Sequence, residues 1–353
     1  MSASEMTEVL RRLVEAESFS TDREGVELCG NIIDELCRDM LGSGTETIGS
    51  NRIWRRQGER PVLLLCHYDT VWPRGTLAEF PFTVDDGVAR GPGVFDMKGG
   101  IVQCLWAVRE VTDGPITILF TGDEEIGSPA SRSLIEEEAL NSRAVLVLEP
   151  AEGTSLKLAR KGTGTFRVDI RGRASHAGLA PEQGINSALE LADQIRVIDG
   201  MGRPDEGTTV TVTMLGGGSA NNVVPESAWC AVDLRMWSAE EAERIDRGLH
   251  ALEPIREGAT ISISGGVNRM PMERKTTEEL YRRVVELGYD FGAAEVGGAS
   301  DGNFTAALGV PTLDGLGSVG GGAHARDEHV LVEEMPRRAE MVARLLESLL
   351  ADG

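Results

Sequence analysis

The chain is short of basic residues, of aromatic residues and of any closely spaced cysteine pair. Its 353 residues include 35 Lys and Arg against 57 Asp and Glu, which gives a net charge of −22. No basic cluster interleaved with aromatic residues offsets this charge. Nucleic acid and anionic membranes are therefore poor partners, because their phosphate groups would be repelled. Solubility is a sufficient explanation for the acidic surplus.

Long apolar runs are also missing. No stretch approaches the ~18 apolar residues that span a membrane, and the N-terminus lacks the basic and apolar segments of a secretory signal. The five cysteines are odd in number, and no two form a Cys-x-x-Cys pair. We therefore expect reduced, mostly buried thiols in a cytoplasmic protein with no membrane partner.

Hydrophobic periodicity predicts α/β structure in the first and last parts of the chain. Continuous apolar runs, typical of strands buried on both faces, occur at 62–66, 116–120 and 144–148. Helical spacing occurs at 4–16, 24–40, 98–111, 129–140, 276–287, 301–308 and 332–351. On the helix at 24–40, the expected apolar stripe is Leu28, Ile32, Leu36 and Met40. The alternation of buried strands and helices predicts a mostly parallel central sheet flanked by helices.

The middle of the chain has a different texture. Apolar and polar residues alternate, as in strands with one solvated face, at 166–171, 209–214, 228–236 and 260–264. Helices are expected between them at 186–198 and 238–252. The resulting order of elements is that of a split βαβ, an α+β sandwich. We therefore predict a larger domain of 1–160 and 268–353, interrupted by a smaller domain of 161–267.

The first buried strand leads directly into His67-x-Asp69. Parallel strands deliver the residues just past their ends to one shared edge of the sheet, where α/β folds place their sites. There a neutral imidazole can bind a metal ion, and Asp69 can orient that imidazole. The alternative is a core histidine beside a turn aspartate, which this short motif alone does not exclude.

Carboxylates occur at three further positions of this kind. Asp96 lies where a glycine-rich loop meets a helix, so it either bridges two metal ions or caps the helix. Glu124 and Glu125 follow the second strand, where adjacent carboxylates repel unless a cation or proton compensates them. One can ligate a metal ion while the other takes a proton from water, although an acidic surface turn is the simpler alternative. Glu149 ends the third strand, which is costly without a partner.

A second histidine completes the set. His324 follows three glycines, which allow a loop to carry the imidazole close to a metal ion. His329 is a weaker candidate. Two imidazoles and several carboxylates are the ligand set of a zinc-type hydrolase, most simply one with two metal ions.

These segments together resemble the dinuclear zinc aminoacylase/carboxypeptidase family, and in particular its carboxypeptidase G (glutamate carboxypeptidase) branch. The resemblance extends from about residue 60 to residue 330 and rests on His67-x-Asp69, Gly93-x-x-Asp96-Met-Lys-Gly-Gly, Asp123-Glu-Glu-x-Gly-Ser, Glu149-Pro and His324. It implies a zinc-exopeptidase-like α/β fold, with a ferredoxin-like insertion that acts as lid and dimerisation domain.

The resemblance also implies roles for individual residues. Two zinc ions per subunit, for which cobalt or manganese could substitute, would be held by His67, Asp96, Glu125, Glu149 and His324. Asp96 would bridge the ions, with a cis peptide bond after it. Glu124 would be the general base and then the acid, while Asp69 would steer His67.

In the insertion, His176 resembles the lid histidine that reaches the active site of the partner subunit in a homodimer and stabilises the oxyanion. Asn222 and Arg235 resemble the residues that hold the substrate carboxylate. Without the resemblance, these three would be taken as a strand-end histidine, a turn asparagine and a surface arginine.

The expected reaction is hydrolysis of an N-acyl amino acid or peptide at an amide bond, with release of a C-terminal amino acid. The alternative within the family is an N-acyl deacylase of the acetylornithine or succinyl-diaminopimelate type. A catalytically silent metal-binding homologue would require a broken ligand set, and every expected ligand is present. A phosphate-binding loop is not supported, because no Gly-x-x-x-x-Gly-Lys-Ser/Thr occurs.

Overall fold

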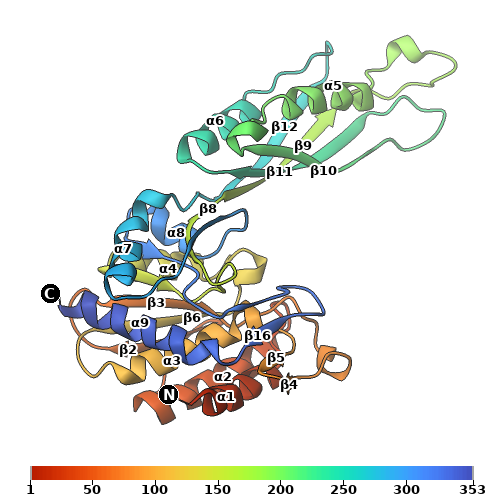
Figure 1. The fold of residues 1–353 in the computed structure, drawn as a ribbon. Helices are drawn as coiled ribbons and strands as arrows, with labels where there is room; N and C mark the ends of the chain where they lie inside the picture. The colour runs from red at the N-terminus through yellow and green to blue at the C-terminus, as the bar shows by residue number, and fades with distance from the viewer. Residues whose placement is uncertain (1, 352–353) are drawn as a thin grey trace. The chain divides into compact units, whose positions relative to one another are not determined.

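A computed structural model describes residues 2–351, which divide into two compact units (Figure 1). The first unit contains the chain up to Ala159, the segment Met272–Val296 and the chain from Ser300 onward. The second contains Arg160–Pro271 together with Gly297–Ala299. Each unit has its own sheet and its own hydrophobic core.

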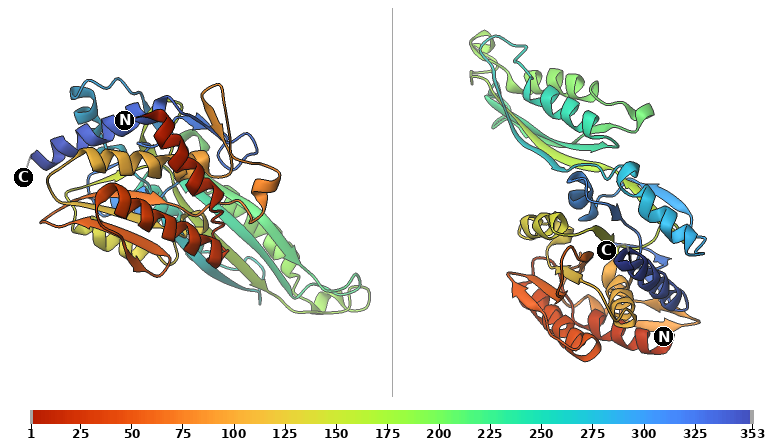
Figure 2. Two further views of the ribbon diagram at one scale, coloured as in Figure 1. Left: turned by 90° about the horizontal axis from the view of Figure 1, so that it is seen from below. Right: turned by 90° about the vertical axis from the view of Figure 1, so that its left-hand side faces the viewer.

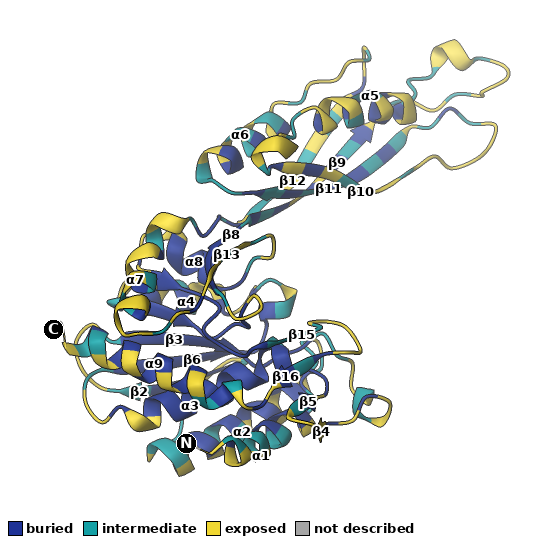
Figure 3. Cartoon of the chain, viewed as in Figure 1, coloured by how far each residue is buried: buried dark blue, intermediate teal, exposed yellow. Residues whose placement is uncertain are grey.

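The first unit is built on a six-stranded sheet with the order β1-β2-β6-β3-β7-β14. Strands β6, β3, β7 and β14 are parallel, while at one edge β2 pairs antiparallel with β6 and β1 pairs antiparallel with β2. The bounds are β1 Glu46–Ile48, β2 Asn51–Arg56, β3 Val62–His67, β6 Ile116–Thr121, β7 Ala144–Val147 and β14 Thr312–Leu313. All residues of β3, β6 and β7 are buried (Figure 3), as the continuous apolar runs predict.

Helices cover both faces of this sheet (Figure 2). Leu64 and Cys66 of β3 belong to the core that includes residues of α1, α2, α3 and α9, whereas Leu63 and Leu65 belong to the core that includes α4 and α8. This alternation follows from the two-residue period of a strand. The helices are α1 Ala3–Glu15, α2 Arg23–Leu41, α3 Gly99–Glu110, α4 Arg132–Leu140, α7 Glu278–Glu286, α8 Gly302–Ala307 and α9 Glu334–Ala351.

Shorter elements complete this unit. A small sheet has the order β15-β16-β5-β4, and β13 pairs with β8. The strands are β4 Thr83–Asp85, β5 Val88–Arg90, β8 Leu156–Arg160, β13 Ala293–Val296, β15 Gly320–Gly321 and β16 His329–Leu331. The short helical turns are η1 Thr76–Ala78, η2 Val94–Lys98, η3 Glu124–Ile126 and η6 Arg274–Thr276. The pairing of β16 with β5 brings the segment after residue 320 beside the segment before residue 91.

The second unit is an antiparallel sheet of order β10-β11-β9-β12 with two helices packed on one face. Its elements are β9 Gly162–Arg171, α5 Ser187–Asp199, β10 Thr209–Gly217, β11 Ser227–Met236, α6 Ala239–His250 and β12 Thr260–Arg269, with the turns η4 Pro181–Gln183 and η5 Pro204–Glu206. This is the predicted order of strands and helices. The predicted fold class is therefore confirmed, with a mostly parallel α/β sheet and an inserted ferredoxin-like α+β sheet.

The apolar stripe predicted for α2 is partly right, because Leu36 is buried and Ile32 and Met40 pack partly buried against the core. Leu28 is 50% exposed, while Cys29, Ile33 and Cys37 are fully buried. The two cysteines behave as small apolar side chains, so they turn the buried face away from Leu28. All five cysteines are buried and unpaired. No helix within residues 2–351 is both long enough and apolar enough to cross a bilayer.

Gly100, in the first turn of α3, should not tolerate a side chain. A Cβ there would lie 2.0 Å from the carbonyl oxygen of Leu148, just before Glu149. Gly100→Ala should therefore lower the free energy of unfolding by about 1–3 kcal/mol through overpacking, although alanine favours helices by about 1 kcal/mol. Gly248→Ala in α6 is the control, because its nearest contact is the sulfur of Met201 at 3.4 Å. Equal urea midpoints for the two variants would contradict this expectation.

Candidate metal centre

The candidate ligands lie where neighbouring parallel strands end. β3 ends at His67, which is in register with Thr121, the last residue of β6. Glu124 and Glu125 follow Thr121 in the turn η3, and Glu149 comes two residues after β7. Because parallel strands share one carboxyl edge, these side chains reach the same place.

Asp96 lies between two imidazoles. Its Oδ1 is 3.1 Å from Nε2 of His67, and its Oδ2 is 3.4 Å from Nε2 of His324. Each oxygen of one carboxylate thus faces a different nitrogen ligand. This arrangement is suited to a carboxylate that bridges two cations.

Each imidazole also faces a second carboxylate. Oε1 of Glu149 is 3.4 Å from Nε2 of His67, and Oε2 of Glu125 is 3.2 Å from Nε2 of His324. We call His67, Asp96 and Glu149 the inner half-site, and Asp96, Glu125 and His324 the outer half-site. Each offers one nitrogen and two carboxylates, a donor set suited to a divalent metal ion.

One atom of the outer half-site supports the fit to a cation directly. Oε1 of Glu125 is buried and has no hydrogen-bond partner among the described residues. Such an oxygen is costly to bury unless a cation compensates it. The donor atoms of His67, Asp96 and Glu125 lie within 4.8 Å of one another, close enough to hold a metal ion.

Asp69 is fully buried and contacts more than the imidazole that it was predicted to steer. Nδ1 of His67 lies 3.1 Å from the backbone carbonyl oxygen of Asp69 and 3.5 Å from its Oδ1. The carboxylate accepts the backbone N–H groups of Glu124 (3.1 Å) and Glu125 (3.2 Å), and the hydroxyl of Ser20 (2.7 Å). Asp69 therefore joins the end of β3 to the turn that carries the two glutamates.

Glu124, the predicted general base, is 8% exposed at the inner half-site. One of its oxygens lies within 4.8 Å of donor atoms of His67 and Glu149. The carboxylate of Glu124 therefore lies beside the ligand atoms of the inner half-site, where a general base would have to be.

The carboxylates shift the titration of both imidazoles. Asp96 and Glu125 raise the pKa of His324 to about 10. Burial lowers the pKa of His67, but Asp69 and Asp96 outweigh it, so this pKa is raised well above its ordinary value. Burial raises the pKa of Glu125. All three shifts have one meaning: the cluster favours added positive charge, which protons or metal ions can supply.

Two loops reach the centre in unusual backbone conformations. Gly93 has a φ of 73°, and a Cβ there would lie 2.6 Å from Cγ2 of Thr70. The peptide bond from Asp96 to Met97 is cis, as the resemblance implied. His324 has a φ of 62°, which residues other than glycine adopt rarely. A positive φ at a residue other than glycine is concentrated at functional sites.

In the second unit, the environment of His176 fixes one tautomer. Its Nδ1 accepts the backbone N–H groups of Gly178 and Leu179, both at 3.1 Å. A neutral ring that accepts at Nδ1 carries its proton on Nε2. The ring is exposed, and the N–H of Ala177 donates to the carbonyl of Asn222 at 2.9 Å, so Asn222 lies beside it.

Arg235, also in the second unit, forms a two-pronged pair within its own strand. Its Nε and Nη2 donate to the two oxygens of Asp233 at 2.9 and 3.0 Å. Arg167 on β9 pairs with Asp169 in a similar way, through Nε at 2.9 and 3.1 Å. Both arginines thus pair with an aspartate two residues away in the same strand, and only Arg235 carries a predicted role.

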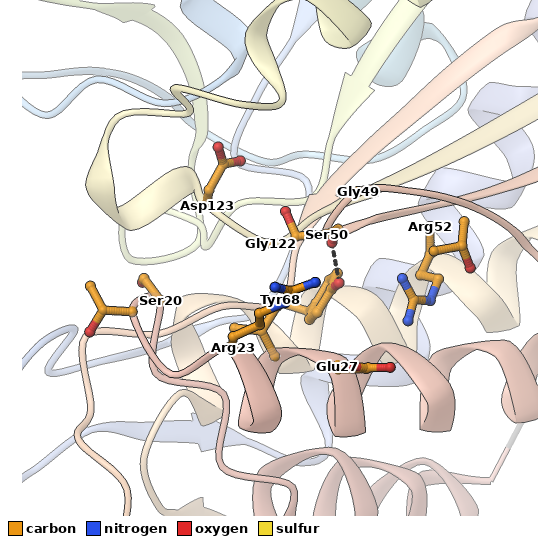
Figure 4. A pocket seen from close by; sticks show the side chains of 12 residues that line it. Ser20, Arg23, Glu27, Gly49, Ser50, Arg52, Tyr68, Gly122 and Asp123 are labelled. Carbon is orange, nitrogen blue, oxygen red and sulfur yellow. Dashed lines mark hydrogen bonds between the residues drawn. The ribbon is translucent and has the colours of Figure 1, made fainter.

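A cavity of about 430 Å³ lies in the first unit beside the strand ends (Figure 4). Tyr68 lines it, and the tyrosine hydroxyl donates to the carbonyl of Ser50. Asp123 and Arg23 line it as well. Because side chains alternate along extended chain, Tyr68 points away from its neighbour His67. This cavity is therefore distinct from the two half-sites.

Two contacts at the centre were not predicted. Ser20 donates to Asp69, and Glu328 accepts backbone hydrogen bonds from the loop at 91–98, here called the Asp96 loop. Ser20 carries no local signal. The only hint of Glu328 is its place in the acidic segment just after His324. The neighbouring His329, the weaker candidate, instead directs Nδ1 at the carbonyl of Asp327, 2.8 Å away.

Comparison with known proteins gives a consistent result. The model of peptidase family M20/M25/M40 matches residues 63–348. Carboxypeptidase G2 of Pseudomonas sp. (strain RS-16) is 33% identical over 96% of this chain and 88% of its own length. Succinyl-diaminopimelate desuccinylase of Dechloromonas aromatica (strain RCB) is 27% identical over 97% of this chain and 98% of its own length.

Among solved structures, a dinuclear metal-binding peptidase of Bacillus subtilis, YXEP, has the same fold, with a TM-score of 0.70 at 14% identity and coverage of 99% and 98%. The family match spans both the half-sites and the inserted unit. Histidine and carboxylate side chains able to hold metal ions lie together within that span. The chain belongs to peptidase family M20/M25/M40, and it is a metal-dependent hydrolase of the metallopeptidase type.

Proposed function

We propose that this enzyme is a two-zinc carboxypeptidase of the glutamate type, which hydrolyses an amide bond and releases a C-terminal amino acid. The observation that carries the proposal is the position of Asp96, with one oxygen toward each imidazole. The similarity to carboxypeptidase G2 supports this substrate class, since it is stronger than the similarity to the desuccinylase.

The inner half-site would hold one zinc ion and the outer half-site the other, with Asp96 shared. Cobalt or manganese could replace zinc, because the same nitrogen and oxygen donors suit all three. When bound, the two ions would polarise the scissile carbonyl and lower the pKa of a water molecule. The carbonyl oxygen of Asp69 lies at hydrogen-bond distance from Nδ1 of His67. This contact orients the ring so that its Nε2 faces the inner half-site.

Glu124 would move the protons of the reaction. Its carboxylate would take a proton from the attacking water and later deliver it to the nitrogen of the leaving amine. The carboxylate is nearly buried, and its backbone is fixed by Asp69. The catalytic group therefore sits on a turn anchored to a strand end, which restricts it to one position.

His176 would stabilise the oxyanion of the tetrahedral intermediate. The two backbone donors on Nδ1 leave Nε2 as the N–H donor, and no further reorganisation is needed before it donates. The resemblance assigns this histidine to the active site of the partner subunit, so we propose that the enzyme is a homodimer. We keep a cytoplasmic location as part of the proposal, supported by five buried, unpaired thiols.

Arg235 and Asn222 would bind the carboxylate of the released amino acid. Asp233 holds the guanidinium of Arg235 through Nε and Nη2. This pairing fixes the plane of the group, and a substrate carboxylate would be received by Nη1 or would displace Asp233. The substrate is therefore a small N-acyl amino acid or peptide with a free α-carboxylate.

The second candidate is a deacylase of the acetylornithine or succinyl-diaminopimelate type. The desuccinylase similarity, 27% over 97% of the chain, favours it to a lesser degree. Both candidates share the metal centre and the general base, so they differ only in the groups that the substrate pockets accept. Turnover of N-acyl-glutamate against N-acetylornithine and N-succinyl-diaminopimelate separates them.

Removal of metal should destabilise the first unit, because the carboxylates of the half-sites would then repel one another. For each ion, free metal at 100 times its dissociation constant adds about 2.7 kcal/mol of stability, which corresponds to a rise of ~5–10 °C in Tm per bound ion for a unit of this size. Differential scanning calorimetry of chelated and reloaded protein measures this rise.

Elemental analysis provides the control for that experiment. Wild type should hold two metal ions per chain, and Glu125→Ala and Glu149→Ala should each lower this number, since each removes one ligand from one half-site. Two tightly held ions in both variants, or a Tm independent of metal, would refute the assignment of these ligands.

Glu124→Gln should lower kcat by about 10²–10⁴-fold, the usual contribution of a general base, without loss of metal. Glu137→Gln, on the exposed face of α4, is the control for removal of one acidic charge. The assay is release of amino acid from N-acyl-glutamate, with metal content measured on the same samples. Activity of Glu124→Gln within a few-fold of wild type would rule out this role.

Arg235→Ala should raise KM for N-acyl-glutamate by about 10–100-fold, equivalent to a charge-assisted hydrogen bond of ~1.5–3 kcal/mol. Arg167→Ala removes a similarly paired arginine from the neighbouring strand and should leave KM unchanged. A substrate analogue in which an amide replaces the α-carboxylate should bind wild type poorly. Its KM should not rise further in Arg235→Ala, because the group that Arg235 would bind is already missing. Equal KM values for the two variants would show that Arg235 does not bind the carboxylate.

A further inference from the structure

Glu328 is a fully buried carboxylate surrounded by hydrogen-bond donors. Its Oε1 accepts the backbone N–H groups of Phe95 and Asp96, both at 3.0 Å. Its Oε2 accepts the backbone N–H of Gly93 at 2.9 Å and the indole N–H of Trp72 at 2.8 Å. Three of these four donors belong to the Asp96 loop.

All four neighbours donate, so the group in their centre must accept at both oxygens. A carboxylate does so, whereas an amide in its place would direct its N–H₂ group at two of the donors. Successive backbone N–H groups that converge on an anion form a concave binding site of fixed shape. The Asp96 loop is therefore wrapped around the side chain of Glu328.

The other end of this contact is the segment that carries His324. That segment leaves β15 and returns in β16, with Gly321 opposite His329. Glu328, just before β16, therefore lies at the base of the segment, and His324 lies near its tip. The side chain of His324 is 50% exposed and its φ is positive, so burial alone does not fix its position.

We propose that Glu328 is a positioning residue for the metal centre: it holds Asp96 and His324 in the relative arrangement that both half-sites need. Asp96 and Glu328 are 232 residues apart in the sequence, and this carboxylate joins the two ligand-bearing loops directly. The inference rests on the proposed two-metal centre for its consequence, while the contact itself does not depend on a metal ion.

Asp69 supports the same principle at a second place. It accepts the N–H groups of Glu124 and Glu125, as Glu328 accepts those of the Asp96 loop. Neither of these buried carboxylates is a ligand in the half-sites. Each instead holds the backbone of a segment that supplies ligands or the base.

The test compares Glu328→Gln with Glu328→Ala and Trp72→Phe. Glutamine keeps the size of the side chain but turns an N–H₂ group toward two donors, while Trp72→Phe removes one donor and leaves the three loop contacts intact. Substitution of groups that orient metal ligands weakens metal affinity by about 10–100-fold. We expect such a loss for both Glu328 variants and less than ~3-fold for Trp72→Phe, measured by competition between the protein and a chromophoric zinc chelator.

Hydrogen exchange of the peptide that covers residues 93–96 gives a readout that needs no metal. These amides should be protected in wild type and in Trp72→Phe, and exposed in Glu328→Gln. Wild-type zinc affinity and wild-type exchange in Glu328→Gln would overturn the inference, because a merely space-filling role predicts this result. If wild type binds two zinc ions but does not hydrolyse N-acyl-glutamate, the proposed function fails and the role of Glu328 stands. If Glu328→Ala does not fold, the comparison of Glu328→Gln with Trp72→Phe still tests the inference.

Discussion

The centre of this enzyme depends on the compensation of concentrated negative charge. Asp96, Glu125 and Glu149 meet at two imidazoles. Because they are buried, water does not screen their mutual repulsion as it does for the exposed carboxylates of this acidic chain. Protons on His67 and His324 relieve part of this repulsion, as the raised pKa values of both rings indicate. Divalent ions would relieve more of it, so metal affinity and fold stability are two aspects of the same interaction.

The residues that can be predicted from the sequence are those whose position follows from a strand. β3, β6 and β7 are continuous apolar runs, and a ligand after such a run must lie at the carboxyl edge of the sheet. Ser20 and Glu328 could not be predicted, because their partners are distant in the sequence. Ser20 donates to the carboxylate of Asp69, and Glu328 accepts backbone N–H groups of the Asp96 loop. The exposure of Leu28 was missed for a different reason: the stripe predicted for α2 contained only Leu, Ile and Met, and it left out Cys29 and Cys37.

The second unit illustrates how a role can depend on a residue's immediate neighbours. His176 is exposed, so burial gives no sign of function, and its sequence motif alone is ambiguous. The two N–H groups that donate to Nδ1 show which ring nitrogen accepts, and so which one, Nε2, is left to donate. Asp233 has a comparable effect on Arg235, since it fixes the plane of the guanidinium. In both cases a backbone or side-chain neighbour sets the direction of one donor.

The two half-sites differ in how far their histidines are buried. The inner half-site takes His67 from the end of a buried strand, with a side-chain exposure of 2%. The outer half-site takes His324 from a loop that follows three glycines, and the side chain of His324 is 50% exposed. Order in that loop must come from contacts at its base, and Glu328 supplies them through the Asp96 loop. Since Asp96 faces both imidazoles, the two half-sites share one carboxylate, and the contact of Glu328 with the Asp96 loop bears on both of them.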